Sequence, residues 1–349
     1  MLNTQPLLPL SNHDLINHLL VHRMGIRFTN VFIGILLVFF SINSFSSEKS
    51  ALLTVGLSVW SGYPESVKGF KHAMQEGGFI EGDNVNYILK ASNTDKNKQR
   101  EIASQFKDLK VDLVYSLTTP GTIIIKEILP ADTPIVFSIV TYPADSGLIE
   151  SFEYSGNNLV GTSNYVPLNH HVDLLTNMLP EAKKVAIFHR KGEPNSKIQT
   201  ASLTRAFKRQ GIKVINQAPV SIEEVKTMAL SLIGKVDAFV TTTDTLMQGG
   251  GEKALIDISL KNKLPILSSN KSGIENGSTF GPAADFYTLG FMSGTKAVQI
   301  LLRNKTPAQL ESEFQNPPLI MLNKQSIDKL GLTVPSRLHS SAKWVDTTK

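Results

Sequence analysis

The chain has 349 residues, 41% hydrophobic and 19% charged, with a formal net charge of +5 and no cysteine. This length exceeds what one hydrophobic core usually holds, so we expect two lobes, and the composition excludes a mostly disordered chain. The positive charge is not gathered into a dense basic block, which argues against a nucleic-acid partner. The lack of cysteine excludes disulfides, thiolate chemistry and lipid attachment through an N-terminal Cys.

The N-terminal region, residues 1–47, is expected to be a signal peptide or an N-terminal membrane segment. A short apolar stretch, Val31–Phe40, follows Arg23 and Arg27 and precedes the small-x-small sequence Ser44-Phe45-Ser46. This pattern is typical of a secretory signal, so we predict cleavage after Ser46 and release into a periplasm. The stretch is short for a membrane span of ~20 residues, and an uncleaved anchor is the alternative. Met24 is an alternative start of the chain.

Strand-like and helix-like stretches then alternate from about Ala51 to about Lys329, which is typical of a parallel sheet with crossover helices. In the first part of this region we expect strands at 52–59, 84–89 and 111–117, and helices at 65–77 and 98–109.

The two halves of the chain repeat one another, which predicts two similarly wound lobes with ligand-facing loops at the carboxyl ends of their strands. Three pairs of segments match at offsets of 130, 125 and 131 residues: Val55–Ser66 with Val185–Ser196, Val111–Tyr115 with Val236–Val240, and Thr133–Val136 with Leu264–Leu267.

A series of short phrases between Val55 and Gly331 resembles the ABC-transporter substrate-binding proteins of the tryptophan/tyrosine-binding type, a branch of the type I periplasmic binding proteins. The phrases, in order, are Gly69-Phe70, Gly77-Gly78-Phe79, Glu81-Gly82, Val111–Val114, Thr119-Pro120, Pro134–Phe137, Gly161–Ser163, Leu179–Val185, Glu193–Ser196 and Gly234–Ala238.

The resemblance implies an α/β fold with two Rossmann-like lobes, whose parallel sheets are joined by a three-segment hinge around a ligand cleft. The crossings are expected near Ser163–Leu168, Gly281–Asp285 and Pro317–Leu319. The expected N-terminal lobe is 48–164 plus 283–317, the C-terminal lobe is 165–282 plus 318–335, and 336–349 is a C-terminal tail. One loop departs from the family pattern, because Thr141-Tyr142-Pro143 stands where Thr-Asp-Pro is usual. This exchange replaces an acidic group suited to an α-amino nitrogen by a phenol.

Two loops are candidates for binding a carboxylate. Thr118 and Thr119 follow an apolar strand, and the free N–H groups of the next helix start suit an anion. The alternative is plain capping, with Thr119 as N-cap and Pro120 at N1. Glu193 with Asn195 and Ser196 occupies the matching loop of the second lobe, where the family resemblance favours a ligand contact. The alternative there is an exposed first turn of a helix.

The remaining candidates are aromatic or polar residues near expected strand ends. Trp60, Tyr63 and Tyr142 could sandwich a planar ligand, with Trp60 favoured, or could be core or hinge residues. Asp244 and Asp285 could receive an ammonium group, or could be helix N-caps. Three further predicted ligand contacts are Ser138, Thr141 and Asn270.

The chain contains none of the common motifs for nucleophilic, phosphate-binding or metal-dependent catalysis, and Gly249–Gly251 lacks the Lys that completes a phosphate loop. His170 and His171 are adjacent and point differently on a helix, so they are poor joint metal ligands. We therefore predict no enzyme activity, no cofactor and no metal.

The predicted function is an exported solute-binding protein of an ABC importer, a monomer that binds a small molecule by hinge closure and meets a membrane permease and an ATPase. The ligand is expected to be an amino acid, with an aromatic one as the leading option. The alternatives are a sensor that presents its ligand to a membrane receptor and an exported α/β enzyme.

Overall fold

The computed structural model describes residues 52–302 and 305–347, which belong to one compact unit, Leu52–Lys349. The predicted signal segment at 1–47 lies outside the described residues. Within these two ranges, no helix combines the length and the apolar character that crossing a membrane requires.

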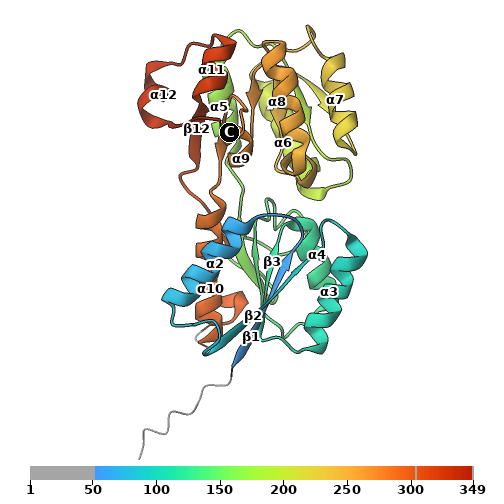
Figure 1. Cartoon of the computed structure of the whole chain (residues 1–349), viewed down its shortest axis with the longest axis vertical. Coiled ribbons are helices and arrows are strands. Elements are labelled where there is room, and N and C mark those ends of the chain that lie inside the picture. Colours follow the sequence, from blue (N-terminus) through green and yellow to red (C-terminus); the bar gives the residue numbers. More distant parts are fainter. Residues whose placement is uncertain (1–51, 303–304, 348–349) are drawn as a thin grey trace, which may run out of the picture. The chain divides into compact units, whose positions relative to one another are not determined.

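The first lobe is a parallel six-stranded sheet with the order β11-β5-β4-β3-β1-β2 and helices on both faces (Figure 1). Its strands are β1 (Leu53–Val59), β2 (Val85–Ala91), β3 (Leu113–Leu117), β4 (Ile135–Ser138), β5 (Leu159–Ser163) and β11 (Glu313–Phe314). Its helices are α2 (Pro64–Glu76), α3 (Lys96–Asp108), α4 (Thr119–Ile128) and α10 (Phe286–Leu301), followed by the 3-10 turn η2 (Pro307–Gln309).

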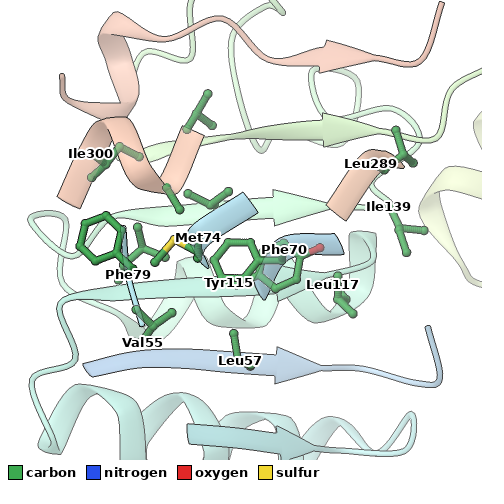
Figure 2. Packing of buried hydrophobic residues seen from close by; sticks show 14 of the residues in the cluster. Val55, Leu57, Phe70, Met74, Phe79, Tyr115, Leu117, Ile139, Leu289 and Ile300 are labelled. Atoms are coloured by element: carbon green, nitrogen blue, oxygen red, sulfur yellow. The ribbon is translucent and has the colours of Figure 1, made fainter. Parts of the chain in front are cut away.

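The first sheet is covered on both faces, because every residue of its central strands β3 and β4 is buried, whichever face it points to. Phe70 of α2 stacks on Tyr115 of β3 with ring centroids 4.0 Å apart, on the side covered by α2 and α10 (Figure 2). Phe106 of α3 and Phe137 of β4 belong to a second buried cluster, which includes residues of α3 and α4.

The second lobe is a seven-stranded sheet with the order β13-β12-β10-β9-β8-β6-β7, in which β12 runs antiparallel to β10. Its strands are β6 (Lys184–Phe188), β7 (Lys213–Gln217), β8 (Ala238–Thr241), β9 (Ile266–Leu267), β10 (Phe280–Ala283), β12 (Leu319–Asn323) and β13 (Lys343–Val345). Its helices are α5 (Leu168–Met178), α6 (Pro194–Arg209), α7 (Ile222–Ser231), the π-helical turn η1 (Met247–Gly251), α8 (Glu252–Lys261), α9 (Lys271–Glu275), α11 (Lys324–Leu330) and α12 (Ser336–Ser341).

The internal repeat and the α/β fold are confirmed by the strand order. The first sheet contains β4-β3-β1-β2 and the second contains β9-β8-β6-β7, so each matched pair of sequence segments occupies the same place in its own sheet. The loops after β1 and β3 in the first lobe, and after β6 and β8 in the second, therefore lie at the same edge of their sheets, where α/β proteins bind ligands.

The chain passes between the two sheets three times, close to the expected crossings, although Gly281–Ala283 of the second expected crossing belong to β10. It crosses after β5, after β10 and between β11 and β12. The expectation that 336–349 is a tail separate from the lobes is wrong, because β13 within it pairs with β12 and extends the second sheet. Main-chain hydrogen bonding thus makes 343–345 part of the second lobe.

Helix α10 returns from the second lobe and packs closely on α2, although more than 200 residues separate them in sequence (Figure 1). Glycines allow this approach. A Cβ atom at Gly69 would lie 2.1 Å from the carbonyl oxygen of Tyr287, and one at Gly290 would lie 2.0 Å from that of Ser66. These distances are shorter than any normal contact, so neither position has room for a side chain.

Candidate functional site

Two adjoining cavities lie where the loops after the strands of both lobes meet. The larger has a volume of about 570 Å³ and the smaller about 10 Å³, and they share Tyr63, Thr245 and Gln248 in their linings. The smaller cavity is lined by Tyr63, Thr118, Thr119, Ile139, Asn164, Glu193, Asn195, Thr243, Asp244, Thr245 and Gln248.

Buried polar atoms without hydrogen-bond partners gather around the smaller cavity. Among the described residues, the side-chain oxygens of Thr118, Thr119, Asn195 and Gln248 are buried and have no partner. An unsatisfied buried polar atom costs about 1–3 kcal/mol, so four of them around one cavity are expensive unless a ligand completes them. All four belong to the cavity lining, which makes this cavity the candidate binding site.

The two threonines stand at the start of α4 and leave their hydroxyls free. Thr118 is the N-cap residue, with φ 71° and ψ 157°, and its side chain makes no capping hydrogen bond. The alternative that Thr119 merely caps the helix is wrong, because Thr119 is the first helical residue and its hydroxyl is unpartnered. Two hydroxyl donors beside a helix N-terminus suit a carboxylate.

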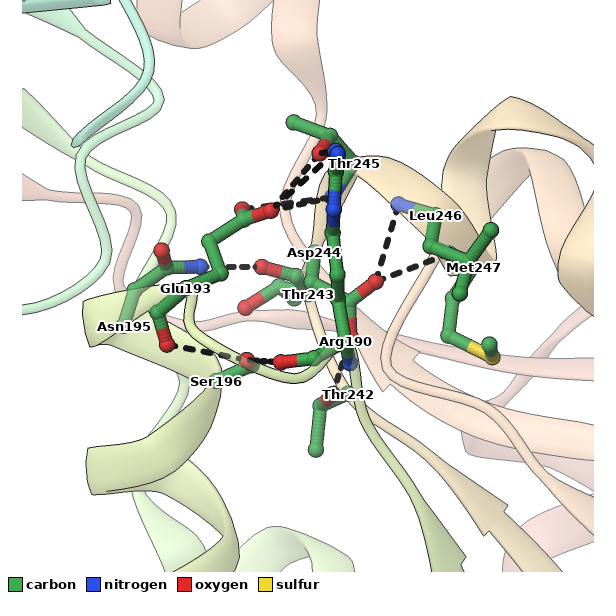
Figure 3. Close-up of polar contacts among 10 residues, drawn as sticks. All are labelled: Arg190, Glu193, Asn195, Ser196, Thr242, Thr243, Asp244, Thr245, Leu246 and Met247. Atoms are coloured by element: carbon green, nitrogen blue, oxygen red, sulfur yellow. Dashed lines mark hydrogen bonds and ion pairs between the residues drawn. The ribbon is translucent and has the colours of Figure 1, made fainter. Parts of the chain in front are cut away.

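Asn195 faces the smaller cavity as a hydrogen-bond acceptor. Its Nδ2 donates to the carbonyl oxygen of Thr243 at 2.5 Å, which leaves Oδ1 free (Figure 3). Ser196 does not line either cavity, because its hydroxyl donates to the carbonyl oxygens of Arg190 and Glu193, both at 3.1 Å. Asn195 and Ser196 were expected to donate to a carboxylate. In the structure Asn195 instead offers an acceptor, and the Ser196 hydroxyl already donates to the backbone.

Glu193 adds negative charge on the same side of the cavity. Its Oε2 accepts a 2.6 Å hydrogen bond from the hydroxyl of Thr245, and its side chain is 6% exposed (Figure 3). Burial, and then the nearby Asp244, raise the pKa of Glu193 from 4.5 to about 7, against the lowering effect of the bonds from Thr245 and of Arg190. A cation beside Glu193 would stabilise its ionised form.

Asp244 caps the start of the helical turn that follows it, which was the alternative to a ligand contact. Its Oδ1 accepts from the backbone N–H groups of Leu246 and Met247, at 3.0 and 2.8 Å. Its Oδ2 accepts from the N–H of Arg190 and the hydroxyl of Thr242, at 2.9 and 2.7 Å. With four donors already placed, Asp244 contributes the shape and the negative field of the site.

The smaller cavity therefore has two chemically different sides. The first lobe supplies the hydroxyls of Thr118 and Thr119 and a helix N-terminus, which favour an anion. The second lobe supplies Asn195 Oδ1, Gln248 Oε1 and the carboxyl of Glu193, which favour a hydrogen-bond donor with positive charge. A zwitterion matches both sides.

Asn270 lies one layer behind the cavity. Its Nδ2 donates to Glu252 at 2.7 Å, and its Oδ1 accepts from Gln248 at 2.9 Å. Neither cavity lining includes Asn270. The predicted ligand contact is thus replaced by a contact with a residue that lines the cavity.

Two other polar candidates make hydrogen bonds within the protein. Asp285 caps α10 by accepting from the N–H of Thr288 at 3.0 Å, and it pairs with Lys271. Ser138 shares a hydrogen bond with Thr162 in the first-lobe interior.

The remaining polar candidate, Thr141, joins the lobes instead of lining a cavity. Its hydroxyl donates to Oδ1 of Asn164 at 2.9 Å and lies 3.2 Å from the hydroxyl of Thr243. These contacts connect the first lobe to the crossing at Asn164 and to the second lobe.

The aromatic candidates separate into one cavity residue and two packing residues. Tyr63 lines both cavities and contacts Phe286 edge-on, with ring centroids 5.2 Å apart. Trp60, the favoured stacking residue, is 2% exposed and lines neither cavity, so it is a core residue. Tyr142 packs against Tyr165, with ring centroids 5.6 Å apart, next to a crossing between the lobes. This position agrees with the alternative that Tyr142 is a hinge residue.

The larger cavity is suited to a large, partly apolar group. Tyr63, Phe286 and Tyr287 supply aromatic surface, and Arg190 and Lys271 supply positive charge. It opens beside the two-sided polar cavity, so a ligand could place charged groups in one and a side chain in the other.

Sequence reasoning missed several lining residues, above all Asn164, Thr243, Thr245 and Gln248. The internal repeat contained a signal for one of them, because the 125-residue offset between β3 and β8 makes Thr243 the equivalent of Thr118 in the second lobe. Gln248 lies on the π-helical turn η1, and no periodic pattern in the sequence predicts such a turn.

The described residues contain no cluster of three or more His, Cys, Asp or Glu side chains arranged to hold a metal. His171 is buried with Nε2 3.1 Å from the hydroxyl of Ser269, and burial lowers its pKa to about 3. It therefore stays neutral inside the second lobe.

Comparisons with known proteins agree with this architecture. The sequence model of the family described as ABC transporter substrate binding protein matches residues 60–346. A curated relative, a tyrosine-binding protein of Clostridioides difficile, is 28% identical over 281 residues, which cover 80% of this chain and 81% of the relative.

Solved structures share the fold over nearly their whole length. An ABC domain from Streptococcus pneumonia in complex with L-Trp is 23% identical, with a TM-score of 0.79, and the match covers 84% of this chain and 100% of that one. The ligand-free, open structure of a substrate binding protein with adhesive properties from Clostridium difficile is 26% identical, with a TM-score of 0.68 and coverage of 85% and 100%.

Proposed function

We propose that this chain, which belongs to the ABC transporter substrate binding protein family, binds an aromatic amino acid outside the cytoplasm for an ABC importer. The observation that carries the proposal is the group of four unpartnered buried oxygens around the smaller cavity. Their arrangement supports a ligand with donors at one end and an anionic group at the other.

In this proposal the ligand ammonium lies on the side of the second lobe. Asn195 Oδ1 and Gln248 Oε1 can each accept an N–H, and Glu193 supplies the compensating charge. The ligand carboxylate lies toward Thr118 and Thr119, whose hydroxyls donate beside the start of α4. A carboxylate placed instead beside Glu193 and Asp244 would be repelled by two buried acidic groups.

The ligand side chain then occupies the larger cavity. Its volume of about 570 Å³ exceeds what a small aliphatic side chain needs, and Tyr63, Phe286 and Tyr287 offer edges and faces for an aromatic ring. A relative described as tyrosine-binding and a similar structure holding L-Trp support an aromatic side chain.

The polar cavity requires the lobes to move for binding and release. At about 10 Å³ it cannot admit an amino acid as it stands, so we propose hinge opening at the three crossings. The moving bodies are then the lobe built on the six-stranded sheet and the lobe built on the seven-stranded sheet, which includes β13. A permease and an ATPase are the proposed partners of the closed, monomeric, periplasmic protein, whose role is transport rather than catalysis.

Calorimetric titration with the twenty common L-amino acids, and with a neutral polyol as comparison, tests the proposal. We expect L-tyrosine or L-tryptophan to bind most tightly and to raise the melting temperature in proportion to ln(1 + [L]/Kd). Tight binding of the polyol, with no binding of any amino acid, would contradict the proposed function.

A further inference from the structure

A buried acidic side chain lies two hydrogen bonds away from the smaller cavity. Glu252, the first residue of α8, is 3% exposed. Its Oε1 accepts from the hydroxyl of Ser278 at 2.6 Å, and its Oε2 accepts from the hydroxyl of Thr241 at 3.2 Å. A Cβ atom at Gly273 would lie 2.1 Å from Oε1, so α9 closes over the carboxyl group.

Glu252 fixes which way the amide of Asn270 points. Asn270 Nδ2 lies 2.7 Å from Oε2 of Glu252 and 3.2 Å from the carbonyl oxygen of Thr242. Both neighbours are acceptors, and the reversed amide would face them with its own oxygen. The amide nitrogen must therefore point inward, and Oδ1 of Asn270 points toward η1.

Asn270 in turn fixes the amide of Gln248. Gln248 Nε2 donates to Asn270 Oδ1 at 2.9 Å, so Gln248 Oε1 is turned away from this contact. That oxygen is buried, has no partner among the described residues, and belongs to a residue that lines both cavities. The π-helical turn that carries Gln248 is a local distortion of the kind often found at functional sites.

We propose that Gln248 is a specificity-determining residue that accepts an N–H from the ligand, and that Glu252 is a positioning residue that acts through Asn270. Glu252 sets the direction of the Asn270 amide, and Asn270 sets that of the Gln248 amide. In this orientation Gln248 turns its Oε1, an acceptor, away from Asn270 and leaves it for the ligand. The inference deepens the proposed function and rests on it, since it assigns Gln248 to the ammonium of a bound amino acid.

A purely structural role of Glu252 makes a different prediction. If Glu252 only stabilises the start of α8, its replacement weakens all ligands equally. If it orients Gln248, its replacement weakens only ligands that carry the amino group. A ligand pair that differs in this group therefore separates the two roles.

The test uses calorimetric titration of L-tyrosine and of 3-(4-hydroxyphenyl)propionate, which lacks the amino group. In Gln248→Leu we expect L-tyrosine to bind roughly ten- to a hundred-fold more weakly, with less than about a two-fold change for the deaminated analogue. Glu252→Gln should give a smaller loss that is selective in the same way, because its amide can offer a donor to Asn270 and permits reversal, while the carbonyl oxygen of Thr242 still favours the original orientation.

Ser278→Ala is the matched control. It removes a hydrogen bond to Oε1 of Glu252 without touching the contact between Oε2 and Asn270, so it should keep the preference for L-tyrosine. Asn270→Leu cuts the chain of amides in its middle and replaces Glu252→Gln if that variant does not fold.

The outcomes separate the two proposals. Equal losses for both ligands in Gln248→Leu, or an unchanged preference when Glu252 or Asn270 is replaced, would overturn the inference and leave amino-acid binding intact. If wild type binds neither L-tyrosine nor any other amino acid, the proposed function fails, and the inference fails with it.

Discussion

Asn195 donates from Nδ2 to the carbonyl oxygen of Thr243 at 2.5 Å, and this one contact decides the chemistry of its side of the cleft. This contact fixes the direction of the amide and leaves Oδ1 buried and unpartnered among the described residues, so that the side chain offers a ligand an acceptor. An asparagine that the sequence suggested as a carboxylate donor is therefore, in our proposal, an acceptor for the ligand ammonium.

Asn195→Ala should weaken amino-acid binding and also lower the melting temperature of the unliganded protein, because it removes the donor to the carbonyl oxygen of Thr243. Loss of one hydrogen bond to a charged group costs about 1–3 kcal/mol, which is roughly five- to a hundred-fold in Kd. Calorimetric titration measures the affinity, and thermal melting of the unliganded variant measures the fold.

Ser196→Ala is the control for that variant, because its hydroxyl bonds to the backbone of Arg190 and Glu193 and not to the cavity. We expect a change in melting temperature with a smaller change in affinity. A larger loss of affinity in Ser196→Ala than in Asn195→Ala would reverse our assignment.

Binding should become tighter as the pH rises toward neutrality. The pKa of Glu193 in the unliganded protein is raised to about 7, and an ammonium beside it stabilises the ionised form, so binding releases a proton below that pH. Between about pH 5.5 and pH 7.5 we expect up to roughly ten-fold tighter binding. Asp244, Arg190 and Thr245 face the same group and remain in Glu193→Gln, which should abolish most of this dependence.

Acid should destabilise the second lobe partly through His171. Its pKa is about 3 in the folded protein against 6.5 in the unfolded chain, so the unfolded chain binds the extra proton between these values. The free energy of unfolding therefore falls as pH drops below 6.5, by up to about 1.4 kcal/mol per pH unit. Denaturant titrations of His171→Gln across this range should show a shallower loss. An unchanged slope would show that other groups dominate acid unfolding.

The contact between α2 and α10 should tolerate no side chain at Gly290. Because a Cβ there would lie 2.0 Å from the carbonyl oxygen of Ser66, Gly290→Ala must push the helices apart, at a cost of about 1–3 kcal/mol. Gly249→Ala, at an exposed glycine whose Cβ would meet nothing within 4 Å, is the control for thermal melting. Equal melting temperatures for the two variants would contradict this account of the packing.

Much of the fold could be predicted because it is repeated. Offsets near 130 residues matched β1 with β6, β3 with β8 and β4 with β9, and the strand order places each pair equivalently. A repeat of apolar runs and loops reports main-chain topology, which local sequence patterns encode well. It also placed Thr118, Thr119, Glu193 and Asn195 at the right sheet edge.

The roles of single side chains could not be predicted in the same way. Trp60 lies in a cleft loop and Ser196 in the first turn of α6, yet Trp60 is buried in the core and Ser196 bonds to the loop before its helix. Whether a loop residue faces the cleft depends on one or two backbone dihedrals, such as the positive φ of Tyr63, which composition does not reveal. The path from Glu252 through Asn270 to Gln248 joins residues whose contact depends on tertiary packing.

The most direct measurement is a crystal structure of the protein with the amino acid that binds most tightly in calorimetry. Our account predicts the ligand ammonium within about 2.7–3.2 Å of Asn195 Oδ1, with the carboxylate against Thr118 and Thr119 at the start of α4 and the side chain in the larger cavity. A ligand bound in the opposite direction, with its carboxylate against Asn195 and Gln248, or one that leaves all four buried oxygens unpartnered, would contradict it.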